Sequence, residues 1–109
     1  QAALLAFSAF SEMKHVFLVD EDVDIFDMSD VMWAMTTRFQ GDVDFIPIPG
    51  VHTHVLDPSN DPRYAPSIAV HGIACKSIFD CTVPYKMKEE FERCKFLEVD
   101  VKKWRPYLK

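Results

Sequence analysis

The sequence predicts an α/β fold, a small three-layer sandwich built on a βαβ unit. An apolar, largely β-branched or aromatic run from His15 to Val19 stops at acidic residues, as a buried strand does at the carboxyl edge of a sheet. Residues 28–39 then repeat apolar side chains at helical spacing, and residues 43–48 read as a second strand. Strand, helix and strand in this order predict a right-handed βαβ unit, and a leading helix adds a further layer.

The composition limits the classes of protein that this chain can represent. With 109 residues, 49% of them hydrophobic and 27% charged, residues 1–109 fit a single domain. The net charge of −5 argues against a nucleic-acid partner, and no apolar run approaches the roughly 20 residues of a membrane span. Three cysteines without framework spacing favour reduced thiols, so we expect a cytoplasmic protein.

The first predicted helix covers residues 2–12. Its apolar face comprises Ala3, Leu4, Phe7 and Phe10. The helix has no N-cap and no initiator methionine precedes it, so we expect the chain to be a segment of a longer polypeptide, the C-terminal domain of a larger protein.

The first predicted strand, residues 15–20, leads to a helix at residues 28–39. Asp27 is a suitable N-cap, and Asp30, at the third helical position, approximates a capping box. The face expected to be buried comprises Val31, Met32, Met35 and Phe39. Trp33 lies off this face, which suggests that it packs on a neighbouring element.

The second predicted strand, residues 43–48, contains Pro47, which favours a place at the edge of the sheet. Val43, Phe45 and Pro47 share one face of this strand. Pro49 and Gly50 then predict a turn.

The rest of the chain alternates between a loop and short elements. A long loop over residues 51–67 is expected to be functional or to wrap a partner. A third strand is predicted at residues 76–82, a helix at residues 88–96, and a basic, aromatic tail at residues 98–109. We expect this tail to pack on another element or on a neighbouring subunit.

Acidic residues gather after the first strand: Asp20, Glu21, Asp22, Asp24, Asp27 and Asp30. Carboxylates at a strand end suit Mg²⁺, as in a phospho-accepting receiver domain. Neighbouring acids on a turn usually point apart, however, so a solvated turn that caps the next helix is the favoured interpretation.

Other residues carry weaker signals. His52 and His54, with His71 and Cys75 downstream, suggest a transition-metal site, although histidines in a loop more often bind no metal. Lys76 suits either an anionic ligand or a pair with Asp80. Cys81 is expected to be a buried, inert thiol, since no base can be placed beside it. No motif so far identifies a reaction.

Five segments in order carry a resemblance to one enzyme family. They are residues 14–27 (KHVFLVDEDVDIFD), 31–38 (VMWAMTTR), 48–50 (IPG), 56–58 (LDP) and 76–84 (KSIFDCTVP). Together they resemble the C-terminal domain of the UbiD-like decarboxylases, which include ferulic, gallate and hydroxybenzoate decarboxylases, over residues 1–100.

The resemblance implies a non-oxidative, often reversible decarboxylase of aromatic acids, here phenolic ones. Members of the family use prenylated FMN with Mn²⁺ and K⁺, held mainly by an upstream domain that also supplies the catalytic Glu-Arg-Glu set and the metal ligands. The resemblance therefore implies no catalytic or metal-binding residue in this chain, which alone should be inactive. Implied partners are the aromatic acid, the upstream domain and further subunits.

Phe45 and Pro47 are the implied site residues. When Gly50 is matched to the family's turn glycine, these two occupy places that face the substrate in the ferulic-acid branch. They also share a strand face, as a pocket wall requires. Packing in the core remains an equal alternative for Phe45, and a non-catalytic α/β assembly module remains the alternative function.

Overall fold

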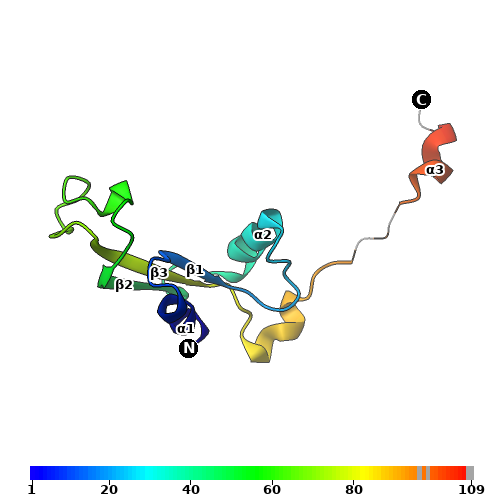
Figure 1. The fold of residues 1–109 in the computed structure, drawn as a ribbon. Coiled ribbons are helices and arrows are strands. Elements are labelled where there is room, and N and C mark those ends of the chain that lie inside the picture. The colour runs from blue at the N-terminus through cyan, green and yellow to red at the C-terminus, as the bar shows by residue number, and fades with distance from the viewer. Residues whose placement is uncertain (96, 98, 108–109) are drawn as a thin grey trace.

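The fold centres on a three-stranded mixed sheet, seen in the computed structural model of Figure 1, which describes residues 1–95, 97 and 99–107. The strands β1 (His15–Leu18), β2 (Phe45–His52) and β3 (Ile73–Asp80) lie in the order β1-β3-β2. β1 runs parallel to β3, and β2 runs antiparallel to it.

The α/β class and the βαβ unit are confirmed, but the unit is completed by a different strand. The parallel neighbour of β1 is β3, whereas β2 occupies an edge. A central strand donates backbone N–H groups to neighbours on both sides, and Pro47 and Pro49 have no N–H to donate. β2 is therefore restricted to the edge of the sheet, as the presence of Pro47 predicted. β3 contains no proline and takes the central position.

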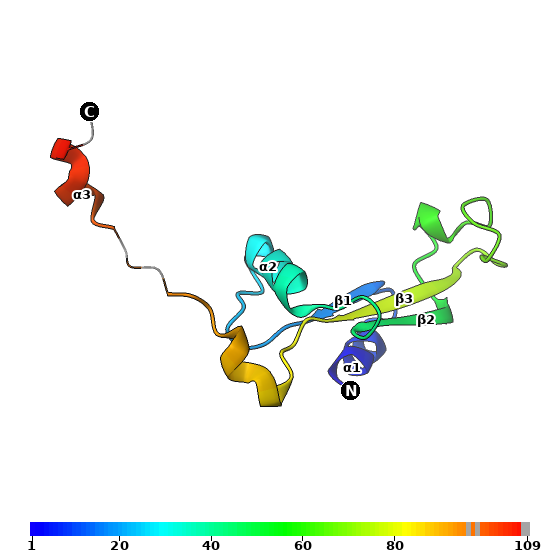
Figure 2. The same cartoon turned by 180° about the vertical axis from the view of Figure 1, so that it is seen from behind.

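Helices lie on opposite sides of the sheet, as Figures 1 and 2 show. Helix α1 (Ala2–Ala9) buries Ala3 and Phe7 against Ile78. Helix α2 (Met28–Arg38) buries Ala34 against Val23 and Cys81, over the carboxyl end of the parallel strands.

Helix α1 ends earlier than expected, at Ala9 instead of residue 12. Phe10 already has an extended backbone, so it leaves the helical face and is exposed, and Leu4 is exposed as well. The predicted apolar face therefore contributes only Ala3 and Phe7 to the core.

Helix α2 matches its predicted range, and its N-cap is confirmed. The Asp27 carboxylate accepts a hydrogen bond from the Ser29 N–H at 2.9 Å. The capping box is wrong, because the Asp30 carboxylate accepts from the Asp24 N–H and from Arg93 instead. The helix buries Ala34 and Arg38 most deeply, while three members of the predicted face, Val31, Met35 and Phe39, pack around that core and the fourth, Met32, is exposed.

The predicted turn at Pro49 and Gly50 is wrong. The backbone continues as β2 to His52, with a register shift between Pro49 and Val51. Gly50 adopts φ 69°, which lets the strand absorb this bulge without reversing. The following loop contains the 3₁₀ helix η1 (Pro58–Asn60), and β3 begins at Ile73, earlier than predicted.

The chain after β3 also differs from expectation. A 3₁₀ helix, η2 (Tyr85–Phe91), replaces the helix predicted at residues 88–96, of which residue 96 lies outside the described residues. Helix α3 (Val101–Trp104) and the 3₁₀ helix η3 (Arg105–Tyr107) stand away from the sheet (Figure 2). Among the described residues, no helix is long and apolar enough to cross a membrane.

Candidate functional site: the aromatic face of the sheet

Phe45 and Pro47 lie on the face of the sheet opposite α1, as their shared strand parity predicted. Phe45 pairs with Phe79 on β3, and their ring centroids are 5.2 Å apart. The Phe79 ring in turn stacks on Phe17 of β1 at 4.6 Å, with an interplanar angle of 8°. Three strands thus bring Phe17, Phe45 and Phe79 into one row, which we call the aromatic face.

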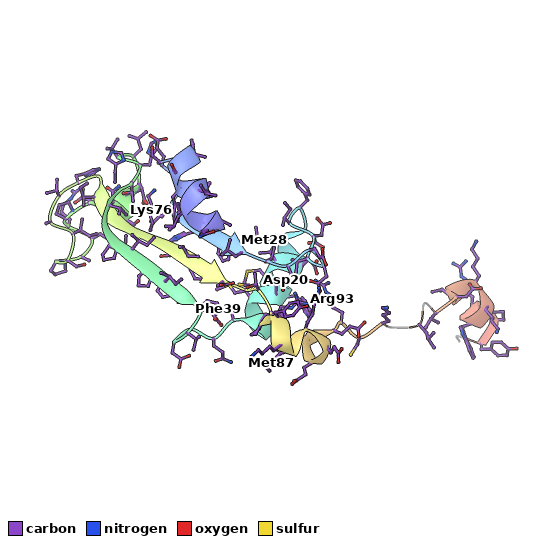
Figure 3. The ribbon with its side chains drawn as sticks, turned by 90° about the horizontal axis from the view of Figure 1, so that it is seen from below. Asp20, Met28, Phe39, Lys76, Met87 and Arg93 are labelled. Carbon is purple, nitrogen blue, oxygen red and sulfur yellow. The ribbon has the colours of Figure 1, made fainter. Side chains whose placement is uncertain are left out.

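The aromatic face is only partly covered. Phe39 follows the last residue of α2, near the sheet (Figure 3), and its ring covers Phe79 with a centroid distance of 5.8 Å. Phe45 and Phe17 keep 38% and 42% of their surface exposed. Phe45 is therefore neither a fully packed core residue nor an isolated surface ring, and one edge remains open to a partner.

The chemistry of this face suits a flat aromatic ligand or another apolar surface. The exposed edges of Phe17 and Phe45, with Pro47 beside them, offer offset stacking and exclude water. Phe17, Phe45, Pro47 and Phe79 have no group that can give or take a proton, so these four residues can position a molecule but cannot react with it. The ionisable neighbour of this face is His15 on β1, whose ring meets Phe79 edge-on at a centroid distance of 5.9 Å.

The acidic turn has a different role from the one proposed for Mg²⁺. Arg38 donates to both oxygens of Asp22, at 2.8 and 2.6 Å, and to Asp20 at 3.3 Å. Asp20 also accepts from the Val83 N–H at 2.8 Å. The hydrogen bond from Arg38 lowers the pKa of Asp22, and the Arg38 guanidinium occupies the space that a cation would need. The receiver-like interpretation is therefore wrong.

A tryptophan and two arginines form a cluster that the sequence reasoning did not find. The guanidinium carbons of Arg38 and Arg93 lie over the Trp33 ring, 4.9 and 3.9 Å from its centroid. Arg93 also pairs with Asp30 at 2.6 Å. The signal was Trp33 itself, an aromatic residue off the apolar face of its helix.

This cluster borders a cavity of about 790 Å³ between the β1–α2 turn and η2. Its ionisable lining residues are Asp20, Glu21, Asp22, Arg38, Lys88, Glu89, Glu92, Arg93 and Lys95. Five acids against four basic groups leave this cavity without a net positive field, which disfavours an anionic ligand.

The metal site suggested for the loop histidines is wrong. The His54 Nδ1 accepts a hydrogen bond from the Leu56 N–H at 3.0 Å, and the His71 Nε2 lies 2.5 Å from the Val55 carbonyl oxygen. Throughout the described part of the chain, no three His, Cys, Asp or Glu side chains are grouped to hold a metal ion.

Lys76 was predicted to bind an anionic ligand or to pair with Asp80, and both predictions are wrong. The prediction that Cys81 is a buried, inert thiol is confirmed. The Lys76 ammonium is buried and donates to the carbonyl oxygens of Ser11 and Met13. Asp80, its other proposed partner, accepts from Thr82 instead. Cys81 is fully buried, and burial raises the pKa of its thiol, so it is a poor nucleophile.

Comparison with known proteins supplies the family context for this geometry. A family model described as "3-octaprenyl-4-hydroxybenzoate carboxy-lyase C-terminal domain" matches residues 1–81. The chain is 56% identical over 110 residues to a gallate decarboxylase of Lactiplantibacillus plantarum, covering 100% of this chain and 22% of that protein.

Solved structures agree. The apo 3,4-dihydroxybenzoic acid decarboxylase from Enterobacter cloacae superposes with a TM-score of 0.84 at 57% identity, over 100% of this chain and 22% of that one. A UbiD-class enzyme from Pelotomaculum thermopropionicum in complex with FMN gives a TM-score of 0.75 at 34% identity, over 98% of this chain and 22% of that one. The chain thus spans about a fifth of the length of these relatives.

Proposed function

Because the chain belongs to the UbiD family of carboxy-lyases, as the family's C-terminal domain, we propose that it serves a non-oxidative decarboxylase of phenolic acids. In this reaction the bond from the ring to the carboxylate breaks, CO₂ leaves, and a proton takes its place. The observation that carries the proposal is the 56–57% identity to decarboxylases named for gallate and 3,4-dihydroxybenzoic acid.

The described residues do not offer a flavin site of their own. Three buried N–H donors of Arg38 and Arg93 have no hydrogen-bond partner within the described part of the chain. Both guanidinium charges are nevertheless paired with acids, beside a cavity lined by five carboxylates, which disfavours a flavin phosphate there. We therefore place prenylated FMN, with Mn²⁺ and K⁺, on the remainder of the decarboxylase, and no step of the reaction is assigned to residues here. The relative solved with FMN supports the flavin part of this proposal.

Within that enzyme, we propose that Phe45 and Pro47 form part of the substrate-pocket wall. Two facts support this role: both share the aromatic face, and Phe45 keeps 38% of its surface exposed beside Phe79. A phenolic ring stacked there would lie against a dry, rigid surface, which favours loss of an uncharged CO₂ molecule.

Three free cysteines, Cys75, Cys81 and Cys94, support a reducing, cytoplasmic location.

The reaction is tested with the full-length protein loaded with prenylated FMN. Gallate, 3,4-dihydroxybenzoate and ferulate are supplied in turn, and CO₂ release is measured. We expect turnover of at least one hydroxylated benzoate. If no acid releases CO₂ from a protein with full flavin content, the decarboxylase proposal is rejected and a non-catalytic assembly module takes its place.

The pocket wall is tested with Phe45→Ala. Removing the ring should change the ratio of kcat/KM between gallate and ferulate by about fivefold, since one lost aromatic contact is worth about 1 kcal/mol. Ile46→Ala is the matched control, because Ile46 is the next residue of β2, is similarly exposed, and points to the opposite face. An unchanged ratio in Phe45→Ala with normal flavin content would remove Phe45 from the pocket.

A further inference from the structure

The short connection between α1 and β1, residues 11–14, contacts two distant parts of the chain. On one side it meets β3. Lys76 is 6% exposed, and its ammonium donates to the Ser11 carbonyl oxygen at 2.5 Å and to the Met13 carbonyl oxygen. The same ammonium lies 5.1 Å from the centroid of the Phe7 ring, so it also holds the last turns of α1.

On its other side the connection meets the loop at residues 53–72. The Lys14 ammonium pairs with Asp57 at 2.6 Å and donates to the Ser59 hydroxyl. Asp57 also accepts from the Ser59 N–H at 2.9 Å, so the partner of Lys14 is part of a closed turn at the start of η1. Glu12 approaches His54 at 3.6 Å as a second link.

The base of the loop is a buried hydrogen-bond cluster around Asn60. This side chain is fully buried and donates to the Thr53 hydroxyl at 3.0 Å and to the His54 carbonyl oxygen at 2.6 Å. Its own oxygen accepts from the Gly72 N–H at 3.3 Å. Since a buried amide that loses its partners is costly, residues 53–60 and Gly72 move together or not at all.

From these contacts we infer that residues 11–14 are a coupling element, through which a displacement of α1 displaces the loop at residues 53–72. Each link joins parts of the chain more than 40 residues apart and uses a charged or buried donor. Figure 3 shows Lys76 beside α1, toward the end of the sheet from which the loop leaves. A two-sided connection of this kind transmits strain, because packed groups shift between discrete arrangements instead of deforming smoothly.

Coupling between α1 and the loop can be measured without the decarboxylation reaction, by hydrogen exchange of the full-length protein followed by mass spectrometry. Lys76→Met touches α1 and residues 11–14 but no residue of the loop. It should raise exchange at residues 53–60 at least threefold. Lys14→Met, which breaks the loop link directly, should do the same. Arg63→Met, which removes an exposed pair with Asp61 inside the loop, is the matched control and should leave residues 53–60 within twofold.

The double variant decides between transmission and two independent effects. If Lys76 acts through residues 11–14, adding Lys76→Met to Lys14→Met should raise loop exchange little further. Additive effects would overturn the inference. Should Lys76→Met fail to fold, Phe7→Leu loosens α1 without touching the loop, and unchanged exchange at residues 53–60 beside raised exchange in α1 would overturn it equally.

Discussion

Arg38 shows how far a single residue can depart from what its type suggests. An arginine in the last turn of a helix usually stands in solvent, but here its side chain is 3% exposed between Asp22, Asp20 and the Trp33 ring. The helix period could not predict this, because the acids that draw Arg38 inward precede the helix. Burial of Arg38 ties the β1–α2 turn to the end of α2.

Arg38→Ala should therefore destabilise the domain by about 2 kcal/mol, measured as a lower midpoint of urea unfolding. The cost stays below that of a fully buried pair because Asp22 is 42% exposed. Arg38→Lys should recover only part of the loss, since the single nitrogen of lysine cannot make the two parallel hydrogen bonds that the guanidinium makes to the Asp22 carboxylate. Arg63→Ala, at an exposed pair, should change the midpoint little; equal losses at both arginines would contradict the assignment.

Acid should destabilise the fold through two carboxylates. Hydrogen bonds from Arg38 and Lys14 lower the pKa values of Asp22 and Asp57 in the folded state. A carboxylate whose pKa is lower in the folded state than in the unfolded state stabilises the fold at pH values above the unfolded pKa of about 4. This stabilisation is lost as the pH falls from there through the folded pKa. The free energy of unfolding should thus begin to drop below about pH 5 and should keep dropping below pH 3, until the pH passes the lowered folded pKa of Asp57. Asp57→Asn should flatten this dependence, and an unchanged slope would contradict the pairing with Lys14.

At the scale of elements, two glycines with positive φ decide how the β2–β3 edge is built. Gly50, at φ 69°, carries the bulge that lets β2 continue, and Gly72, at φ 87°, begins the return into β3. They differ in surroundings. A Cβ on Gly50 would meet nothing within 4 Å, whereas one on Gly72 would lie 3.2 Å from the Val55 side chain.

Gly50→Ala should cost about 1 kcal/mol from the left-handed backbone alone, and Gly72→Ala should cost more because a contact is added. Gly41→Ala is the control, since its φ is not positive and its Cβ would sit at an ordinary 3.8 Å from the Phe39 ring. Urea unfolding of the three variants measures the order. A larger loss at Gly50 than at Gly72 would contradict it.

At the scale of the whole molecule, the tail at residues 99–107 is distinguished by its exposed apolar and basic side chains. Val101, Trp104 and Tyr107 are exposed, and the tail reaches away from the body in Figure 1. Its basic residues, Lys102, Lys103 and Arg105, contrast with a chain of net charge −5. Apolar and basic side chains held away from an acidic body support the proposal that this segment contacts another subunit.

Truncation of the full-length protein after Lys95 should lower the mass or the stability of its assembly, measured by light scattering across a dilution series. The sheet should remain folded, because the described contacts of its core all precede this position. Trp104→Ala tests the anchor alone and should shift the dilution profile in the same direction. Identical profiles for the truncated and intact proteins would reject a role of the tail in association.

The sequence by itself determined the features whose cause is local. Asp27 caps α2 because a short acceptor precedes a helical repeat, and Pro47 forces an edge strand because it lacks an N–H. The parity of Phe45 and Pro47 placed both on one face for an equally local reason. Family membership was also readable, because segments in a given order are a property of the chain alone.

Only the tertiary structure decided which segments meet. It placed β3 in the centre, joined Phe17, Phe45 and Phe79 across three strands, and turned Lys76 toward carbonyl oxygens about 65 residues away. These contacts depend on partners that no local period or spacing identifies. The physical reason is that a buried charge or ring takes whatever partner the packed chain brings to it, and that choice is made by the whole fold.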